Sequence, residues 1–241
     1  MRRVIVVDGT FLKSKYKGVL LVATDLDGDS NLYQIAFGVV DSENDRSWEW
    51  FFRQLLVVIA DGQGVPFVSD RNLSVSKALA KVYPHSSHGI CKHHLLSNVA
   101  FHFKTKGLVG LIAKASKEYM VSEFERRFND ICNISPLVAK YLMEAGVEKW
   151  ARCRFSGFRY DIRTTNPTEL LNSVLRAPRE FSVIPLLDSI REMLTQWFYD
   201  RRRVISKHNS PLTIEIEKKI YRRIEKDKSF RVHPVKNLQE D

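Results

Sequence analysis

The order of strands and helices predicted for residues 4–103 constrains the fold more than any other feature of this chain. Three apolar, β-branched segments come first, and shorter apolar segments then alternate with helical patterns. Predicted strands cover 4–7, 19–24, 32–40, 65–69 and 88–91, and predicted helices begin near Ser47, near 72–74 and at 92. The first three strands are expected to form an antiparallel meander, and the later alternation predicts an α/β sheet.

Residues 107–160 have a different, wholly helical character. Apolar residues recur there at helical spacing, as in Phe124, Phe128 and Ile131. Two further helices are predicted at 168–175 and 184–197, and no repeat or Gly/Ser linker interrupts the chain. The predicted organisation is a core begun by 1–106, a helical insertion at 107–160, the rest of the core at 161–205 and a basic helical tail at 206–241.

Positive charge is concentrated towards the end of the sequence. The net formal charge is +10, and residues 201–241 contribute +6 of it, with 12 Lys and Arg against 6 Asp and Glu. Leu212, Ile216, Ile220 and Ile224 recur every four residues with basic residues between them, which predicts an amphipathic helix. Such a helix either contacts phosphates or exposes a cationic face to solvent. The excess charge favours a polyanionic partner, most simply nucleic acid.

Composition excludes several classes of protein. With 241 residues, 44% of them hydrophobic and 27% charged, the chain can bury a core and is not a disordered tail. It contains no run of about 18 apolar residues, so no membrane span is expected. The N-terminus lacks the apolar core of a signal peptide. Three cysteines do not make a disulfide framework and indicate a reducing compartment.

Two of the predicted strands end at an aspartate, Asp8 after 4–7 and Asp70 after 65–69. Active sites of open α/β sheets collect beyond the carboxyl ends of neighbouring strands. If these strands lie side by side, the two carboxylates repel each other and favour a hard divalent cation, usually Mg²⁺. Each aspartate also suits an ordinary turn, so both interpretations stay open for the pair.

Glu169 is the best third partner for the two aspartates. It follows Asn166 and precedes Asn172 at intervals of three residues, which places Glu169 and Asn172 on one helix face and Asn166 at the cap. Pro167 suits the first helical turn. Three carboxylates can hold two metal ions that act on a phosphodiester. An ordinary glutamate favoured by the helix dipole would explain the same position.

Six short motifs carry a resemblance to a known family. They lie at 7–11, at 37–43 with 47–52, at 69–71, at 91–95 with Asn98, at 165–172 and at 197–202. Each is weak alone, but together and in this order they resemble the transposase core of Mutator-like elements from plants. The resemblance covers about residues 3–205.

The resemblance implies an RNase H-like α/β fold, with a mixed five-stranded sheet flanked by helices and an all-helical insertion before the last catalytic helix. It implies a DDE triad, here Asp8, Asp70 and Glu169, that holds two Mg²⁺ or Mn²⁺ ions. The 99 residues from Asp70 to Glu169 suit a fold with such an insertion. The implied activity is hydrolytic nicking of DNA at transposon ends and strand transfer into target DNA, by a homo-oligomer in the nucleus and without a membrane.

Cys91 and His94 resemble the C-x-x-H signature of the family. A structural zinc site needs four ligands, and no second Cys/His pair with metal spacing is near, so zinc is not expected. With Arg71, Asn166 and Asn172, these side chains are expected to support the carboxylates or contact DNA. The alternative is that Cys91 is a core residue and His94 a capping or exposed one.

Arg163, Arg176 and Arg179 are expected to hold the DNA backbone together with the basic tail. Leu170 stands where the family often has serine. The zinc-type DNA-binding domain that usually precedes the core and the SWIM zinc finger that follows it are not in this sequence. Their lack suggests a fragment, a truncated gene model or a degenerate element copy.

Two other functions stay open. A domesticated descendant would be a DNA-binding transcriptional regulator of the far-red-response type without transposition, but such proteins commonly lose the carboxylates, and all three are present here. A different RNase H-like enzyme, such as a ribonuclease or exonuclease, would share the sheet and the carboxylates. It would not predict the C-x-x-H element or the long helical insertion.

Overall fold

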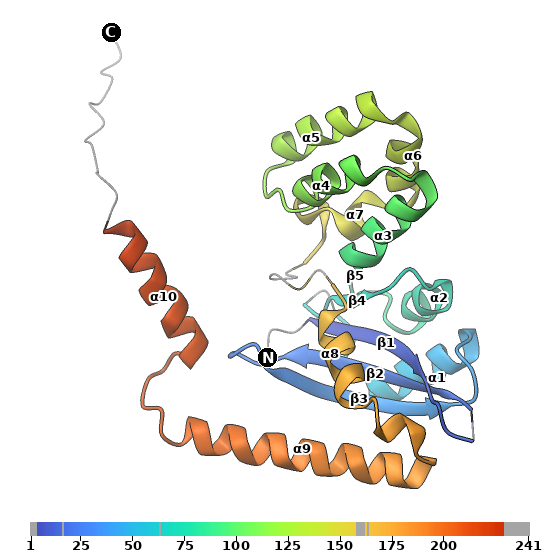
Figure 1. Cartoon of the computed structure of the whole chain (residues 1–241), viewed down its shortest axis with the longest axis vertical. Coiled ribbons are helices and arrows are strands. Elements are labelled where there is room, and N and C mark those ends of the chain that lie inside the picture. Colours follow the sequence, from blue (N-terminus) through green and yellow to red (C-terminus); the bar gives the residue numbers. More distant parts are fainter. Residues whose placement is uncertain (1–3, 16, 63, 158–161, 163, 229–241) are drawn as a thin grey trace.

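The computed structural model describes residues 4–228 except 16, 63, 158–161 and 163. Within these residues, five strands form one mixed sheet in the order β3-β2-β1-β4-β5 (Figure 1). β2 is antiparallel to both β1 and β3, whereas β4 is parallel to β1 and to β5. The strands are β1 (Ile5–Phe11), β2 (Val19–Leu26), β3 (Leu32–Val40), β4 (Phe67–Ser69) and β5 (His88–Ile90).

This topology confirms the fold class expected from the sequence. An antiparallel meander is extended by two parallel strands, and helices flank the sheet, as in RNase H-like domains. β1 is longer than predicted, since it continues past Asp8 to Phe11 instead of ending at the aspartate.

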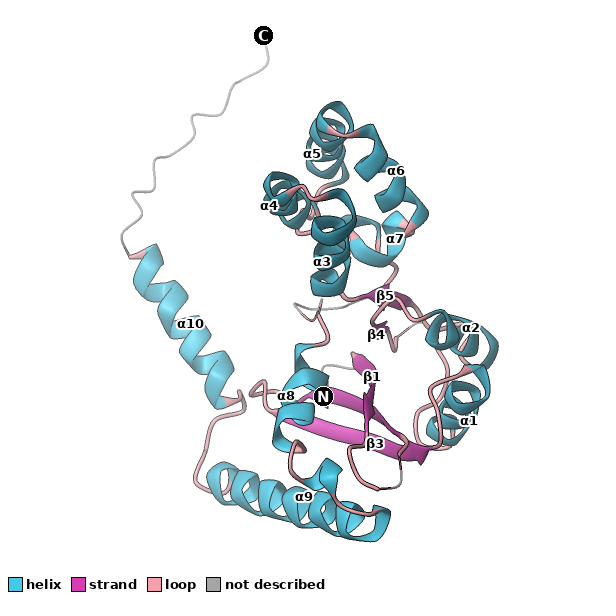
Figure 2. Ribbon diagram, turned by 45° about the vertical axis from the view of Figure 1, so that its right-hand side comes forward, coloured by secondary structure: helices cyan, strands magenta, loops and turns pink. Residues whose placement is uncertain are grey.

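Helices α1 (Asp45–Leu56) and α2 (Leu73–Val82) cover one face of the sheet (Figure 2). Because strand side chains alternate, Ile5 and Val7 point to this face and Val4 and Val6 to the other. Each fully buried large side chain here contributes about 2–3 kcal/mol of transfer free energy. The aromatic part of this core comprises Trp48, Phe51, Phe52, Phe67 and Tyr83.

Helices α8 (Asn166–Val174) and α9 (Val183–Ile205) pack on the opposite face, joined by the short helix η2 (Pro178–Glu180). Leu20 and Val22 of β2 meet Leu171 of α8 and Leu186 of α9 in this second core. Leu170 of α8, in contrast, is exposed. α8 is therefore fixed against the middle of the sheet.

The middle of the chain forms a helical unit of its own, drawn in green and yellow in Figure 1. Its elements are α3 (Lys92–Phe103), α4 (Lys106–Ala115), α5 (Val121–Ile134), α6 (Pro136–Glu144), α7 (Val147–Trp150) and η1 (Arg152–Arg154). Leu95 and Val99 of α3 share its core with Ile131 and Trp150. α3, which follows β5 directly, thus packs with the residues of the helical insertion.

Three helix boundaries differ from the prediction. α1 begins at Asp45, because the Asn44 side chain accepts a hydrogen bond from the Ser47 amide and takes the capping role predicted for Ser47. α8 begins at Asn166 after Thr165, so Asn166 lies in the helix and not at its cap. α9 continues through Ile205.

The basic tail forms helix α10 (Ile214–Asp227), which extends away from the sheet (Figure 1). At its start, Asp29 accepts a hydrogen bond from the Glu215 amide at 2.9 Å, and Thr213 donates to the Gly28 carbonyl at 3.2 Å. Ile220 and Ile224 of the predicted apolar stripe are exposed. No helix of the described residues has the length and apolar character needed to cross a membrane.

Gly18 gives a test of how tightly the meander packs. A Cβ at Gly18 would lie 2.7 Å from the backbone oxygen of Val40, whereas a Cβ at Gly110, inside α4, would meet nothing within 4 Å. We expect Gly18→Ala to lower the free energy of unfolding by about 1–3 kcal/mol and Gly110→Ala to raise it by about 1 kcal/mol. Urea denaturation measures both, and equal stability of the two variants would contradict the packing described.

Candidate active site

Asp8 and Asp70 lie at the same edge of the sheet because their strands pair in parallel. Ile5 is opposite Phe67 and Val6 opposite Val68, so continuing this register sets Asp8 opposite Asp70. Burial, and after it the neighbouring charge of Asp70, raises the pKa of Asp8 to about 6. The pair expected from the two strand ends is therefore brought together.

The Asp70 carboxylate is oriented by the turn that leads into α2. It accepts a hydrogen bond from the Asn72 amide at 3.0 Å, and the Asn72 side chain caps α2 by accepting from the Ser74 amide at 2.8 Å. The next residue, Arg71, stacks on the ring of Tyr141 in α6, with 4.8 Å from guanidinium carbon to ring centroid, and donates to its hydroxyl. The helical unit thus holds a cation beside Asp70.

Helix α8 brings Asn172 onto the first aspartate. The Asn172 amide nitrogen donates to Asp8 Oδ2 at 3.1 Å, and its Oδ1 is buried with no hydrogen-bond partner among the described residues. Glu169 is exposed and accepts from the Thr165 hydroxyl at 3.0 Å. Asn166 is exposed in the first turn of the helix.

Cys91 and His94 are near both the start of α8 and the two aspartates, since Cys91 contacts Thr165 and the charges of Asp70 and Asp8 act on His94. The Cys91 sulfur is buried and accepts hydrogen bonds from the amide and hydroxyl of Thr165, at 3.3 and 3.4 Å. A hydrogen bond to Cys91, together with the smaller effects of the charges of Asp70 and Asp8, raises the pKa of His94 to about 9. Burial opposes ionisation of the Cys91 thiol, but bonds from His94 and Thr165 outweigh it and lower the thiol pKa.

The oxygen atoms at this site are of the kind that a hard divalent cation prefers as ligands. Asp8, Asp70 and Glu169 offer carboxylate oxygens, and the unpartnered amide oxygen of Asn172 lies beside Asp8. However, no three His, Cys, Asp or Glu side chains in the described part of the chain are close enough to hold one ion together. Glu169 is linked to Cys91 through the hydroxyl of Thr165.

The three arginines expected to hold DNA differ in their surroundings. Arg176 is exposed, whereas Arg179 turns inward and donates to the Thr10 hydroxyl and to the carbonyls of Phe11 and Asn172. Arg179 therefore ties α8 to β1 and is not a free contact for phosphate. Arg163 lies outside the described residues.

Comparison with known proteins identifies part of the chain. Residues 4–98 match the family model of the MULE transposase domain. The resemblance to Mutator-like transposases is confirmed for this segment. The matched segment contains Asp8, Asp70, Cys91 and His94, and Glu169 lies beyond it.

Seven chains of solved structures are also similar to this chain. A structure of the Mos1 transposase catalytic domain and raltegravir with Mn is 17% identical, covers 64% of this chain and 82% of that chain, and has a TM-score of 0.27. A crystal structure of the catalytic domain of Mos1 mariner transposase is 13% identical, covers 64% of this chain and 81% of that chain, and has a TM-score of 0.26. A search of curated proteins found no match.

Sequence reasoning missed two residues of this site. Glu43 accepts hydrogen bonds from Trp48 Nε1 at 3.1 Å and from Asn72 Nδ2 at 2.7 Å, and its charge also acts on Asp8. Thr165 bonds to both Cys91 and Glu169. The signal for each was present, since both residues lie inside the motifs that carried the family resemblance.

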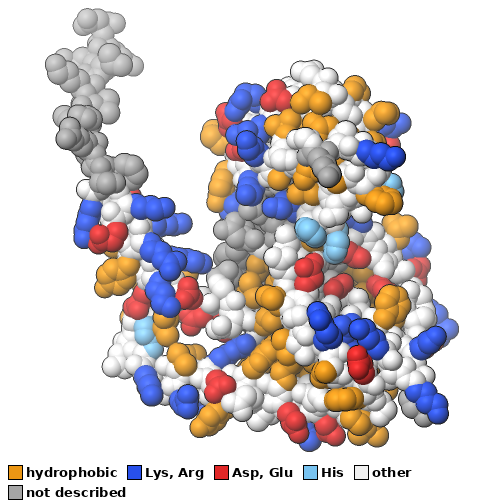
Figure 3. Space-filling view, viewed as in Figure 1, with side chains coloured by type: hydrophobic (Ala, Val, Ile, Leu, Met, Phe, Trp, Pro, Cys, Tyr) orange, Lys and Arg blue, Asp and Glu red, His pale blue; other side chains and the backbone are white. Residues whose placement is uncertain are grey.

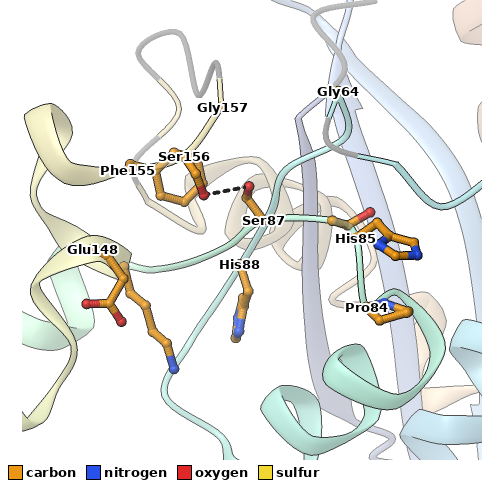
Figure 4. A pocket seen from close by; sticks show the side chains of 11 residues that line it. Gly64, Pro84, His85, Ser87, His88, Glu148, Phe155, Ser156 and Gly157 are labelled. Atoms are coloured by element: carbon orange, nitrogen blue, oxygen red, sulfur yellow. Dashed lines mark hydrogen bonds between the residues drawn. The ribbon is translucent and has the colours of Figure 1, made fainter.

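The space-filling view shows histidine and acidic side chains gathered between the helical unit and the sheet (Figure 3). A separate hollow of about 710 Å³ lies along β5 and is lined by residues of 84–88, 148–149 and 155–157, with Gly64 (Figure 4). Ser87 and Ser156 face each other across it, with 3.0 Å between their hydroxyl oxygens. None of the three candidate carboxylates lines this hollow.

A further titratable group, His88 of β5, lies beside Ser69, the residue before Asp70. Its Nε2 lies 2.8 Å from the Ser69 hydroxyl, and burial, with the charge of Lys149, lowers its pKa from 6.5 to about 4. The folded chain therefore keeps this ring neutral while the unfolded chain takes up a proton between pH 6.5 and 4.

We expect this difference to remove up to about 3 kcal/mol of stability as the pH falls through that window. His88→Gln should lose less of its free energy of unfolding between pH 7 and pH 4.5 than the wild-type chain does. Urea denaturation at the two pH values measures this. An equal loss in both proteins would show that His88 is not the source.

Proposed function

We propose that this chain is the catalytic core of a Mutator-like DNA transposase, which hydrolyses a phosphodiester at a transposon end and transfers the resulting strand into target DNA. The observation that carries the proposal is the pairing of Asp8 and Asp70 at one sheet edge within the segment that matches the family. Two partly buried carboxylates side by side, of which Asp8 has a raised pKa, are costly to the fold, and such sites are typical of function.

Asp8, Asp70 and Glu169 are the residues that would hold two divalent ions, Mg²⁺ or Mn²⁺. When bound, these ions supply Lewis-acid stabilisation of the negative charge on the reacting phosphate. The raised pKa of Asp8 and the unpartnered Asn172 oxygen support this assignment. A cation beside Asp8 would offset the repulsion between Asp8 and Asp70 and would give the Asn172 oxygen a partner.

The remaining residues of the site orient the acids and bind the backbone of DNA. Asn172 fixes one oxygen of Asp8, and the Asn72 amide fixes one oxygen of Asp70. Arg71, held on Tyr141, places a positive charge next to Asp70 that suits a phosphate. Arg176 and the exposed basic residues of α10 add a weaker, salt-dependent attraction.

The proposal includes DNA as the partner, a homo-oligomer as the working form and the nucleus as the location. The match of residues 4–98 to a transposase family supports all three, and the charge of +10 supports the first. The homo-oligomer is proposed because an element has two ends, and two copies of the chain would supply one candidate site for each.

The proposal is tested by nicking of supercoiled plasmid DNA with the full chain in Mg²⁺ or Mn²⁺. We expect Asp8→Asn to lower the nicking rate at least about a hundredfold, since removing a metal ligand costs more than removing its support. Asp188→Asn is the matched control, because Asp188 is exposed on α9 and, among the described residues, pairs with Arg191 at 3.2 Å. It should keep the wild-type rate.

Equal activity of Asp8→Asn and the wild-type chain would overturn the proposal. Cleavage of an RNA–DNA hybrid without cleavage of duplex DNA would favour a ribonuclease instead. A wild-type chain that binds DNA but does not nick it with either metal would favour a domesticated regulator.

A further inference from the structure

The C-x-x-H element contacts the start of the glutamate helix through a single buried residue. Cys91 and Thr165 are both fully buried, and the Thr165 amide and hydroxyl both point at the Cys91 sulfur, at 3.3 and 3.4 Å. The same hydroxyl lies 3.0 Å from Glu169 Oε1. One threonine therefore touches both the cysteine and the candidate catalytic acid.

The other side of Cys91 is attached to the strand that carries Asp70. The Cys91 amide donates to the Ser69 carbonyl at 2.6 Å, which extends the pairing of β4 and β5 to the residue before Asp70. A short series of bonds thus runs from the backbone of β4 through Cys91 and Thr165 to the Glu169 carboxylate.

We propose that Cys91 is a positioning residue for Glu169: its sulfur holds Thr165 at the start of α8, and the Thr165 hydroxyl holds the Glu169 carboxylate at a set distance from Asp70. The inference rests on the proposed function, in which Glu169 holds a divalent ion. It gives the cysteine of the motif a role that needs neither zinc nor a reactive thiol.

The hydrogen-bond inventory of Thr165 makes the two links separable. Its hydroxyl has one proton to donate, and the carboxylate at 3.0 Å is a stronger acceptor than the sulfur at 3.4 Å. The amide N–H then remains to hold the sulfur. Replacing the hydroxyl alone should free Glu169 while α8 stays attached to Cys91.

A plain core role for Cys91 makes a different prediction. A residue that only fills space would affect the free energy of unfolding when truncated, without a specific effect on the metal affinity or turnover of the folded molecules. The polar contacts of Thr165 in a buried position argue against that role, since buried donors are placed where an acceptor satisfies them.

The test compares Thr165→Val with Thr165→Ser in the full chain. Valine keeps the shape and removes the hydroxyl, and serine keeps the hydroxyl. We expect Thr165→Val to weaken Mn²⁺ binding, measured by electron paramagnetic resonance, about tenfold. It should lower kcat for plasmid nicking by a similar factor and leave KM for DNA within about twofold. Thr165→Ser should restore wild-type values.

A second pair of variants tests the link to sulfur. In Cys91→Ala the Thr165 amide loses its acceptor, so we expect its hydrogen exchange to be faster and Mn²⁺ binding to weaken as in Thr165→Val. In Cys91→Ser both should stay close to the wild-type values. If Cys91→Ala does not fold, the threonine pair decides alone.

Equal Mn²⁺ affinity in the wild-type chain and Thr165→Val would overturn the inference, as would a Thr165→Ser variant as impaired as Thr165→Val. A wild-type chain that binds Mn²⁺ but nicks no DNA would overturn the proposed function and leave this comparison of affinities valid. The two failures are therefore distinguishable.

Discussion

The parallel pairing of β1 with β4 is the constraint on which the candidate site depends. Ile5 and Val6 are set opposite Phe67 and Val68, and the apolar cores on both faces of the sheet fix that register. Two residues further along, the same register forces two acids to share one edge. Backbone pairing and burial thus impose an electrostatic repulsion, which a cation at this edge would relieve.

Acidic groups lie on both faces of β1. Asp8 shares a face with Val6 and meets Asn172 from α8, whereas Gly9 points to the opposite face. The absence of a side chain at Gly9 lets the Glu43 carboxyl come so near that a Cβ would lie 3.0 Å from it. Glu43 therefore adds negative potential from behind the strand, and its bonds to neighbouring residues keep it there.

The sequence predicted the parts of the site that depend on local periodicity. A strand end is visible in a run of β-branched residues, and the three-residue spacing of Glu169 and Asn172 defines a helix face; both local patterns are found in the structure. Cys91 and Thr165 are 74 positions apart, and no local pattern predicts that their side chains meet.

Two other details could not be read from residue type. Arg179 has a long side chain that can reach either solvent or the protein. It turns towards the protein because the backbone carbonyls of Phe11 and Asn172 accept its hydrogen bonds. Asn44 and Ser47 are both good capping residues three positions apart. Which one begins α1 depends on where Trp48 must lie to pack against the sheet, and that is a property of the tertiary structure.

The position of the helical unit explains why an insertion of this size is compatible with the site. The chain leaves the sheet at Cys91 and enters α8 at Thr165, and these two residues are in direct contact. An inserted segment whose two ends are in contact can vary in length at little cost in loop-closure entropy to the rest of the fold. The contact between Cys91 and Thr165 also lies next to Glu169. The helical unit can therefore change in length while α8 keeps its position relative to the two aspartates.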